Sequence, residues 1–433
     1  MDTSSAPLPW ALLPDNASVG GDGQLLIGGC DTLELAAEFG TPLFVYDEDH
    51  LRARCREAVA AFGPGVSYAT KAFLCRAMAR LAFEEGMSLD VSTGGEYHVA
   101  RATGVPPERL VLHGNNKSVE ELRVALGEGV GRVVVDSFDE MARIEQLVAG
   151  GLAPPRVLIR ITPGVEAHTH EFVRTGQDDS KFGFPVYSGD ADRALARAAT
   201  SPAMELVGIH AHIGSQVFEA QFFELAVDAV AGFVNAHGLP ELSLGGGLGV
   251  AYVEGETAPT ITDWAAAIHR ACEANGITAR VTAEPGRAIT AAAAVTLYTV
   301  GTIKDLPGIR TYVAVDGGMS DNPRPVLYGS GYETFLPRAV QAPRLKLVTV
   351  VGKHCESGDR LVVDGRVPED LQVGDLLATP VTGAYGHSMG SNYNKVLRPA
   401  VVFVRDGDAR VVVRRETLDD LLRLDVLDPQ GSE

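Results

Sequence analysis

Short runs of apolar, mostly β-branched residues recur from about residue 66 to residue 287. Each run ends in small or polar residues and precedes a segment, such as 72–85 or 222–237, whose apolar residues recur at helical spacing. Eight strands are predicted in this way: Val66–Ala69, Ser88–Val91, Arg109–Leu112, Arg132–Val135, Arg156–Ile161, Leu206–Ile213, Glu241–Leu244 and Ala279–Ala283. Eight strand-then-helix units predict an α/β fold, a TIM (β/α)8 barrel with helices around a buried parallel sheet.

After residue 290 the pattern changes to strand-like runs separated by turn residues: Thr311–Val315, Leu345–Val351, Arg360–Val363, Val401–Val404 and Arg410–Arg414. These runs predict a second, mainly β domain. Two strand candidates, Gln24–Ile27 and Leu43–Val45, precede the barrel and are too few for a stable sheet of their own. We therefore expect an N-terminal segment, 1–45, that joins the C-terminal β domain, 291–433, with the barrel at 46–290.

Residues suited to chemistry or ligand binding are not scattered but fall at the carboxyl ends of these predicted strands. They are Lys71, Asp90, His113, His212, Gly245–Gly247 and Glu284–Arg287. In a barrel the loops after all eight strands surround one mouth, whereas an open doubly wound sheet collects its ligands at one switch point. The distribution therefore favours the barrel.

Composition narrows the class of protein further. The 433 residues are 45% hydrophobic and 21% charged, as in ordinary folded proteins, and the net charge of −19 argues against nucleic acid or an anionic membrane as partner. Five scattered cysteines suit reduced thiols. The start of the chain lacks a secretory pattern, and no apolar run is long enough to span a bilayer. We expect a cytoplasmic protein.

Three sequence features suggest a phosphate-bearing cofactor. Lys71 ends the first predicted barrel strand, where an amine could form a Schiff base, although a lone lysine is more often a solvated charge. The run Gly245–Gly249 could bring backbone N–H groups close to a phosphate, or could be a simple glycine turn. Glu284 and Arg287 close the eighth strand and offer a carboxylate for a pyridine nitrogen and a guanidinium for the phosphate.

Two histidines on one face of the sixth strand leave two interpretations open. Either His212 stacks on a flat cofactor ring with Ser215 near its phosphate, or His210 and His212 bind zinc in a hydrolase barrel. A second HxH pair, His168 and His170, adds to the zinc interpretation. Against it, Arg287 stands beside Glu284, and a cation next to Zn²⁺ would be repelled.

Motifs in order along nearly the whole chain carry a resemblance to a known family. In the barrel they are YATKA (68–72), HGNNKS (113–118), HIGSQ (212–216), GGGLG (245–249) and EPGR (284–287). They resemble the pyridoxal-phosphate decarboxylases of the alanine-racemase-like fold, the ornithine/diaminopimelate decarboxylase family. Later motifs are similar to the diaminopimelate branch: DGGMSDNPRP (316–325), GKHCESGD (352–359), GAY (383–385) and SNYN (391–394).

The resemblance implies pyridoxal 5'-phosphate as the cofactor, carried covalently by Lys71. It also implies that His212 stacks on the ring and Glu284 keeps the pyridine nitrogen protonated, which favours decarboxylation over racemisation. The phosphate would be held by Ser215, Gly246, Gly247, Gly286 and Arg287, and Tyr385 would close the cofactor site. Asp90, His113, Glu96 and Arg160 are expected either to support these residues or to be purely structural.

The resemblance further implies a homodimer with shared active sites, in which Cys355 and Glu356 enter the neighbouring subunit's site. Cys355 is then a candidate proton donor, beside Lys71 and His212 as the other catalytic residues. Without the resemblance, Cys355 would be taken for a small buried apolar residue.

The expected substrate follows from the groups available for its far end. Arg287, Arg324 and Tyr328 offer donors to a distal carboxylate and Glu356 an acceptor to a distal ammonium, with Tyr385 nearby. Meso-2,6-diaminopimelate has both groups, whereas ornithine lacks the carboxylate. The expected reaction gives L-lysine and CO₂, the last step of lysine biosynthesis. Open alternatives are a related decarboxylase for another or a carrier-bound amino acid, a zinc hydrolase barrel and a non-catalytic regulator.

Overall fold

The computed structural model describes residues 6–164 and 179–427. The second HxH pair, His168 and His170, lies outside this part of the chain. The chain divides into two compact units. The β unit comprises Met1–His50, Tyr252–Glu256 and Ala291–Glu433, and the barrel unit comprises Leu51–Ala251 and Thr257–Thr290.

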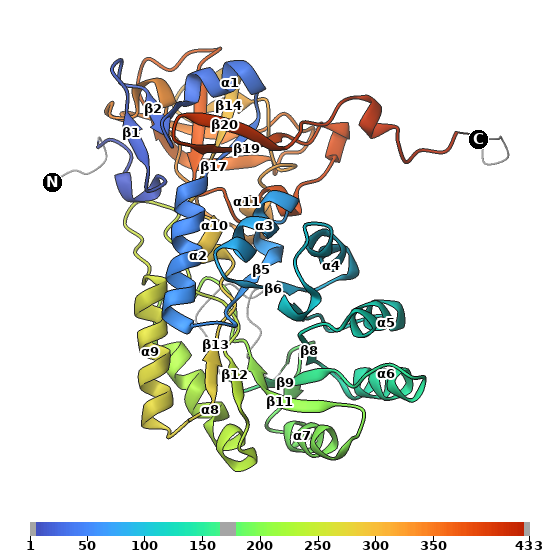
Figure 1. Cartoon of the computed structure of the whole chain (residues 1–433). Coiled ribbons are helices and arrows are strands. Elements are labelled where there is room, and N and C mark those ends of the chain that lie inside the picture. Colours follow the sequence, from blue (N-terminus) through green and yellow to red (C-terminus); the bar gives the residue numbers. More distant parts are fainter. Residues whose placement is uncertain (1–5, 165–178, 428–433) are drawn as a thin grey trace. The chain divides into compact units, whose positions relative to one another are not determined.

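The barrel unit is built on a parallel sheet in which strands adjacent in the chain are mostly neighbours in space (Figure 1). The order of its strands is β13-β12-β11-β9-β8-β7-β6-β5. Two backbone hydrogen bonds, from Ser67 N to Ala283 O (3.0 Å) and from Ala69 N to Pro285 O (3.2 Å), join the first strand, β5, to the segment after the last strand, β13. The strands are β5 (Ser67–Ala69), β6 (Ser88–Val91), β7 (Leu110–Leu112), β8 (Arg132–Val135), β9 (Arg156–Thr162), β11 (Glu205–Ala211), β12 (Glu241–Ser243) and β13 (Arg280–Thr282). The predicted TIM barrel is confirmed.

Helices follow the barrel strands, and Figure 1 shows α4 to α7 in a row outside the strands that precede them. Their bounds are α3 (Arg76–Glu84), α4 (Gly94–Arg101), α5 (Val119–Glu128), α6 (Phe138–Ala149), α7 (Asp190–Thr200), α8 (Gln221–His237), α9 (Ile261–Ala274) and α10 (Arg287–Thr290), and α2 (Glu48–Phe62) precedes the first barrel strand. The helix predicted over 72–85 begins only at Arg76, because a 3₁₀ turn, Thr70–Ala72, follows β5. That turn carries Lys71.

Short polar side chains fix where several of these helices begin. Ser118 starts α5 and Thr260 starts α9, each in a capping box with the carboxylate three residues later. Thr93 and Ser137 accept hydrogen bonds from backbone N–H groups in the first turns of α4 and α6. These caps keep the connections after the strands short, and the side chains at the strand ends are held by rigid neighbours.

The β unit contains a larger sheet in the order β17-β16-β15-β14-β4-β19-β20, with β18 paired to β14, and a small sheet, β1-β2-β3. Strand β4 (Leu43–Asp47) lies between β14 and β19, so the prediction that the N-terminal segment joins the C-terminal β domain is confirmed. Strand β2 (Leu25–Ile27) instead pairs with β1 (Ala17–Val19) and β3 (Cys30–Asp31). The other strands are β14 (Ala294–Leu306), β15 (Arg310–Val315), β16 (Lys346–Val351), β17 (Arg360–Val367), β18 (Leu376–Pro380), β19 (Ala400–Arg405) and β20 (Asp408–Val413).

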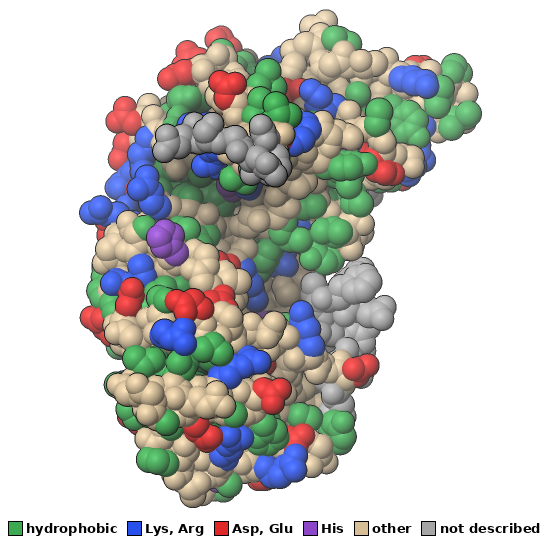
Figure 2. All heavy atoms as spheres, turned by 90° about the vertical axis from the view of Figure 1, so that its right-hand side faces the viewer, with side chains coloured by type: hydrophobic (Ala, Val, Ile, Leu, Met, Phe, Trp, Pro, Cys, Tyr) green, Lys and Arg blue, Asp and Glu red, His purple; other side chains and the backbone are tan. Residues whose placement is uncertain are grey.

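Two helices of the β unit are α1 (Thr32–Phe39) and α11 (Arg324–Tyr328). Among the described residues, no helix combines the length and the apolar character that crossing a membrane requires. On the face shown in Figure 2, acidic and basic side chains are interspersed rather than gathered by sign. The surplus of acid is therefore spread over a mixed surface on that face.

Candidate active site

The predicted site residues of the barrel unit all follow the carboxyl ends of parallel strands. Lys71 follows β5 and His212 and Ser215 follow β11, while the glycines after β12 and the segment after β13 complete the set. Because parallel strands present their carboxyl ends at the same side of a barrel, the fold brings these residues to one mouth.

A buried carboxylate, Glu284, is the centre of a polar cluster in this barrel. His210 Nε2 donates to Glu284 Oε2 at 3.0 Å, and Ser243 Oγ donates to Oε1 at 2.9 Å. His113 Nε2 lies 3.3 Å from Glu284 Oε1 and 3.6 Å from Asp90 Oδ1. The two imidazole rings meet edge to face, with centroids 5.0 Å apart. Residues on or directly after three strands, β7, β11 and β12, thus supply partners to one carboxylate, and Asp90 on β6 lies beside one of these partners, His113.

The protonation of this cluster follows from burial and charge. Burial alone would raise the pKa of Glu284, but the charges of His113 and His210 outweigh it and hold this pKa well below the usual value. Burial raises the pKa of Asp90 to about 6. Burial lowers the pKa of His113, yet Asp90 and Glu284 more than offset it, so the net shift is upward. Near neutral pH Glu284 is therefore an anion.

Lys71 and His212 supply an amine and a neutral ring. The Lys71 side chain is exposed. Burial first and the positive charge of Lys71 second lower the pKa of His212 well below its usual value, so its imidazole is uncharged. A Cβ on Gly245 would lie 2.6 Å from His212 Nδ1, so the glycine allows the backbone to pack against the ring.

The loops after β11 and β12 pack closely against each other at glycines. Gly247 has φ +115°, and a Cβ there would lie 2.4 Å from the carbonyl oxygen of Gly214. Val217 N donates to Gly247 O at 2.9 Å, and Arg287 Nη2 donates to Ser215 Oγ at 2.9 Å. A hydroxyl and a guanidinium therefore lie together beside a glycine-rich backbone, which is a suitable setting for a phosphate.

The barrel residues fit pyridoxal phosphate. An ionised carboxylate suits a protonated pyridine nitrogen, an exposed amine suits a carbonyl carbon, and Arg287 with Ser215 beside the glycine-rich loops suits the phosphate. Gly286 belongs to the same arrangement, since a Cβ there would lie 2.9 Å from the carbonyl oxygen of Ala69 and would push the segment after β13 away from β5.

A metal is a weaker match for these groups. Within the described residues, His113, His210 and Glu284 place ligand atoms within 4.8 Å of one another. In that group each Glu284 oxygen already faces an imidazole nitrogen at hydrogen-bonding distance, so the carboxylate lies between the two rings. The HxH pair proposed for zinc does not act as a pair either, because His210 contacts Glu284 and His212 packs against Gly245.

In the β unit, Arg324 is a buried cation on α11, only 4% exposed. Nη1 donates to the Tyr332 hydroxyl and Nη2 to Ser330 Oγ, both at 3.1 Å, and the guanidinium lies 4.4 Å from the ring centroid of Tyr252. Across residues 6–164 and 179–427 it forms no ion pair with a carboxylate. Tyr328 ends the same helix and is partly buried. A buried guanidinium without a carboxylate is suited to receive one from a ligand.

Cys355 and Glu356 lie on the connection between β16 and β17, and both are exposed. The backbone N–H of Cys355 donates to Asn394 Oδ1 at 3.0 Å, and that of His354 donates to Asp359 Oδ2 at 3.0 Å. The connection is therefore held on both sides of the thiol while the thiol itself is accessible.

Tyr385, the last predicted site residue of the β unit, has φ +59°. A bulky residue in the left-handed region costs conformational energy, and such residues are concentrated at functional sites. The backbone here is therefore held by its surroundings in a conformation that tyrosine does not favour.

Sequence reasoning missed the contacts of two residues with Glu284. His210 was assigned only to the zinc interpretation, and Ser243 was not singled out. The alternation of side chains along β11 could have indicated His210, because it points to the same face as His212. Ser243 had no comparable signal, since a serine in a strand is uninformative by itself.

Part of the motif HGNNKS proves to be structural. Lys117 is buried, pairs with Glu140 at 2.8 Å and donates to the carbonyl oxygens of Gly114 and Val134. Two of the expected supporting residues have partners of their own. Glu96 accepts a hydrogen bond from Ser92 N, and Arg160 lies 3.7 Å from Asp136, while its charge also interacts with those of Glu284 and Asp90.

Comparison with known families identifies the class of this barrel. The model described as "Pyridoxal-dependent decarboxylase, pyridoxal binding domain" matches residues 48–291. The chain belongs to the pyridoxal-dependent decarboxylase family, as the motifs predicted. Within it, the chain is similar over nearly its full length to proteins named diaminopimelate decarboxylase. The relative from Mycobacterium tuberculosis is 48% identical over 97% of this chain and 98% of its own, and that from Bacillus subtilis is 46% identical over 93% and 95%.

Solved structures give the same relationship. Diaminopimelate decarboxylase from M. jannaschii in complex with L-lysine superposes with a TM-score of 0.89 at 32% identity, covering 96% of this chain and 98% of that one. The Helicobacter pylori enzyme, also complexed with L-lysine, gives 0.84 at 32% identity, over 91% and 99%. The barrel with an added β domain is therefore the architecture of these enzymes as well.

Proposed function

We propose that the chain decarboxylates meso-2,6-diaminopimelate to L-lysine and CO₂, with pyridoxal 5'-phosphate carried on Lys71. This would be the last step of lysine biosynthesis, and we infer a cytoplasmic location for it. The observation that carries the proposal is the ionised Glu284 at the centre of a barrel of this family. Relatives named for this activity match nearly the whole chain, and two of the matching structures hold L-lysine.

The barrel residues have separate tasks in this proposal. When bound, pyridoxal phosphate supplies an electron sink for the bond between Cα and the departing carboxylate. Glu284 would hold a proton on the pyridine nitrogen, and His210, His113 and Ser243 fix the carboxylate in place. His212 would pack against the pyridine ring. The phosphate would be held by Ser215, Gly246, Gly247, Gly286 and Arg287.

The buried cation Arg324 supports diaminopimelate rather than a simple diamine precursor. In the proposal Arg324 and Tyr328, with Arg287 and Tyr385, bind the distal carboxylate, and Glu356 binds the distal ammonium. Ornithine would leave the Arg324 guanidinium without a carboxylate, and an unpaired buried charge is costly.

Loss of CO₂ leaves a carbon that must take up one proton. We propose that Cys355 donates it, because the thiol is exposed while its backbone is held by Asn394. We further propose a homodimer in which Cys355 and Glu356 complete the neighbouring subunit's site.

The main alternative is a decarboxylase of this family that acts on another amino acid, free or carrier-bound. A lysine/ornithine decarboxylase from Vibrio vulnificus matches at 24% identity and TM-score 0.72, a likeness that extends to the fold alone. A non-catalytic regulator is a weaker candidate, because Lys71 and Cys355 are both retained.

The cofactor assignment is tested with the purified chain and Lys71→Ala. The native chain should bind pyridoxal phosphate covalently, giving a yellow protein and a mass adduct after borohydride reduction, and Lys71→Ala should lose both along with CO₂ release. An adduct that persists in Lys71→Ala would overturn the assignment.

A further inference from the structure

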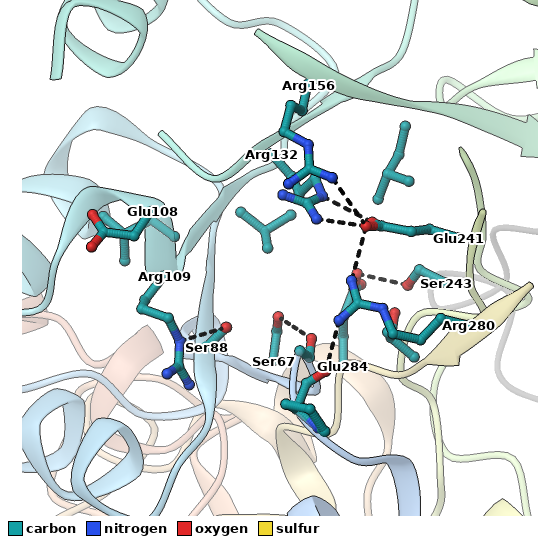
Figure 3. Close-up of a pocket in the computed structure, with 16 residues that line it drawn as sticks. Ser67, Ser88, Glu108, Arg109, Arg132, Arg156, Glu241, Ser243, Arg280 and Glu284 are labelled. Carbon is teal, nitrogen blue, oxygen red and sulfur yellow. Dashed lines mark hydrogen bonds and ion pairs between the residues drawn. The ribbon is translucent and has the colours of Figure 1, made fainter. Parts of the chain in front are cut away.

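The end of the barrel opposite the proposed mouth contains a polar cavity of about 300 Å³ (Figure 3). Much of its lining comes from the amino ends of the strands and from the turns before them, and Ser243, Thr282 and Glu284 add residues from the carboxyl ends of β12 and β13. Arg109, Arg132, Arg156 and Arg280 line the outer part, and Glu284 lies among the inner lining residues together with Ser243. One cavity thus extends from charged side chains at the barrel end to the carboxylate of the proposed cofactor site.

Hydroxyl side chains interrupt the usual apolar layer along this route, which is also lined by Leu110, Val111 and Leu158. Ser67 on β5 is in register with Ser88 on β6, and Ser243 on β12 is in register with Thr282 on β13. All four line the cavity. Barrel interiors of this kind are normally filled by layers of Val, Ile and Leu, so a group of small hydroxyl residues leaves space that water can occupy.

The outer end is charged. Arg132 binds Glu241 through Nε and Nη2, Arg280 Nη2 lies 2.9 Å from the same carboxylate, and Arg156 Nη2 lies 3.7 Å from it. Figure 3 shows these three side chains converging on Glu241. Arg109 stands apart, donating to Ser88 Oγ at 3.1 Å and to a backbone carbonyl. Because drying charged groups is costly, this end retains water.

The volume and the polar lining together suit a hydrated space. At about 30 Å³ per molecule, the cavity could hold on the order of ten waters. The inner end is the hydroxyl of Ser243, which donates to Glu284 Oε1. Water in the cavity therefore reaches a group in direct contact with the carboxylate.

We propose that this cavity is a solvent shaft through which water and protons reach Glu284 from the amino end of the barrel strands. Asp90, His113, His210 and Glu284 form one buried set of neighbouring titratable groups, and its proton count must adjust when a charged ligand binds beside it. A water path from the amino end of the strands allows these groups to gain or lose protons while substrate fills the mouth at the carboxyl end. The shaft rests on barrel geometry alone, whereas its use by Glu284 rests on the proposed function.

Thiol labelling tests the shaft without depending on turnover. In the full chain carrying Cys355→Ser, saturated with pyridoxal phosphate and L-lysine, Ser243→Cys is treated with a small anionic methanethiosulfonate and followed by intact mass. The matched control is Val133→Cys, a fully buried strand position outside the cavity lining. The S243C thiol should react at least about tenfold faster than the V133C thiol, because it meets solvent without unfolding. Equal rates would overturn the proposal.

The direction of entry is tested in the same background by adding Ser88→Val, which puts apolar bulk near the outer end. Labelling at position 243 should slow by about tenfold, and an anionic reagent should react faster than a cationic one of equal size because of the four arginines. Unchanged labelling in the Ser88→Val variant would mean entry from the mouth and would overturn the proposal. A chain that labels as expected but forms no lysine would leave the shaft standing and the proposed function in error.

Discussion

At the scale of single residues, the site is organised around one buried negative charge. Glu284 stays ionised although it is buried, because two histidines and a serine compensate the loss of hydration. A buried charge destabilises the folded state, so its presence here indicates that it interacts with a ligand. Its position after β13 is what the sequence predicted, whereas the partners that fix its protonation came from strands far apart in the chain.

The charge of Glu284 can be removed with little change of shape. Glu284→Gln should lower kcat by about 100-fold or more, because a neutral amide no longer stabilises a protonated pyridine nitrogen. Cofactor binding, followed by absorbance, should persist through the phosphate contacts. Ser243→Ala, which removes one donor to the carboxylate, should have a smaller effect. A Glu284→Gln enzyme within about threefold of native kcat would contradict the role assigned to the charge.

Arg324 is predicted to act on substrate binding. Arg324→Ala should lower kcat/KM for meso-diaminopimelate by roughly 100-fold, mostly through KM, because truncating one partner of a buried ionic contact costs about 2–5 kcal/mol. Arg324→Lys should recover part of this. Arg344→Ala is the matched comparison, since Arg344 is equally buried in the β unit but pairs with Glu254 and Glu333. If both alanine variants shift KM equally, Arg324 has no special role.

Asp321 makes the stability of the β unit depend on pH. Burial raises its pKa from 3.8 to about 7, so the folded state keeps a proton that the unfolded chain loses between these values. The contribution of protonated Asp321 to the stability of the folded state is fully present below about pH 4 and is lost as the pH rises towards 7. Asp321→Asn should therefore show a smaller fall in thermal midpoint from pH 5 to pH 8 than the native chain. Exposed Asp419→Asn should follow the native curve, and an Asp321→Asn curve parallel to it would refute the assignment.

At the scale of elements, the parallel strands could be predicted because they are short, continuous and buried. Ser88–Val91 and Arg132–Val135 have the bounds that the sequence predicted. Strand β14, with 13 residues, was not predicted: its first half is buried on both faces and its second half is largely exposed, so no single period runs through it. Strand β10 (Phe184–Pro185) has two residues and offers no pattern at all.

The sequence predicts which residues form the site better than it predicts which of them contact one another. A motif fixes which residues follow each strand, but the pairing of His210 and Ser243 with Glu284 depends on strand register around the barrel. Register is set by packing of the whole sheet rather than by local sequence. Tyr385 illustrates the same limit, because its positive φ is imposed by its surroundings and left no sign in the sequence.

The capping box of α5 should contribute measurable stability. Ser118→Ala removes the acceptor for Glu121 N and should lower the unfolding free energy by about 1 kcal/mol, measured by urea denaturation. Asn116→Ala, two residues earlier and exposed, should change it by less than about 0.5 kcal/mol. Equal effects would show that the cap is not what stabilises this helix end.

At the scale of the whole molecule, the proposed cofactor residues lie in the barrel unit and the proposed proton donor, Cys355, lies in the β unit. Neither unit alone carries every group that decarboxylation and reprotonation need. The proposed homodimer adds that the thiol serves the neighbouring subunit, which mixing of variants can test.

Lys71→Ala and Cys355→Ala should each be nearly inactive alone. After unfolding and refolding a 1:1 mixture, half of the dimers would be mixed and each would hold one intact site, so about a quarter of native activity should return. Light scattering should give the mass of a dimer. Full recovery of the dimer without activity would contradict shared sites.

The proposed formation of lysine from diaminopimelate can be measured as CO₂ and L-lysine release by the chain loaded with pyridoxal phosphate. Meso-diaminopimelate is compared with ornithine, arginine, lysine and glutamate as substrates. We expect rapid release from meso-diaminopimelate, with equal amounts of CO₂ and L-lysine, and little from the others. Faster release from ornithine or lysine, or none from meso-diaminopimelate by a protein that holds the cofactor, would contradict it.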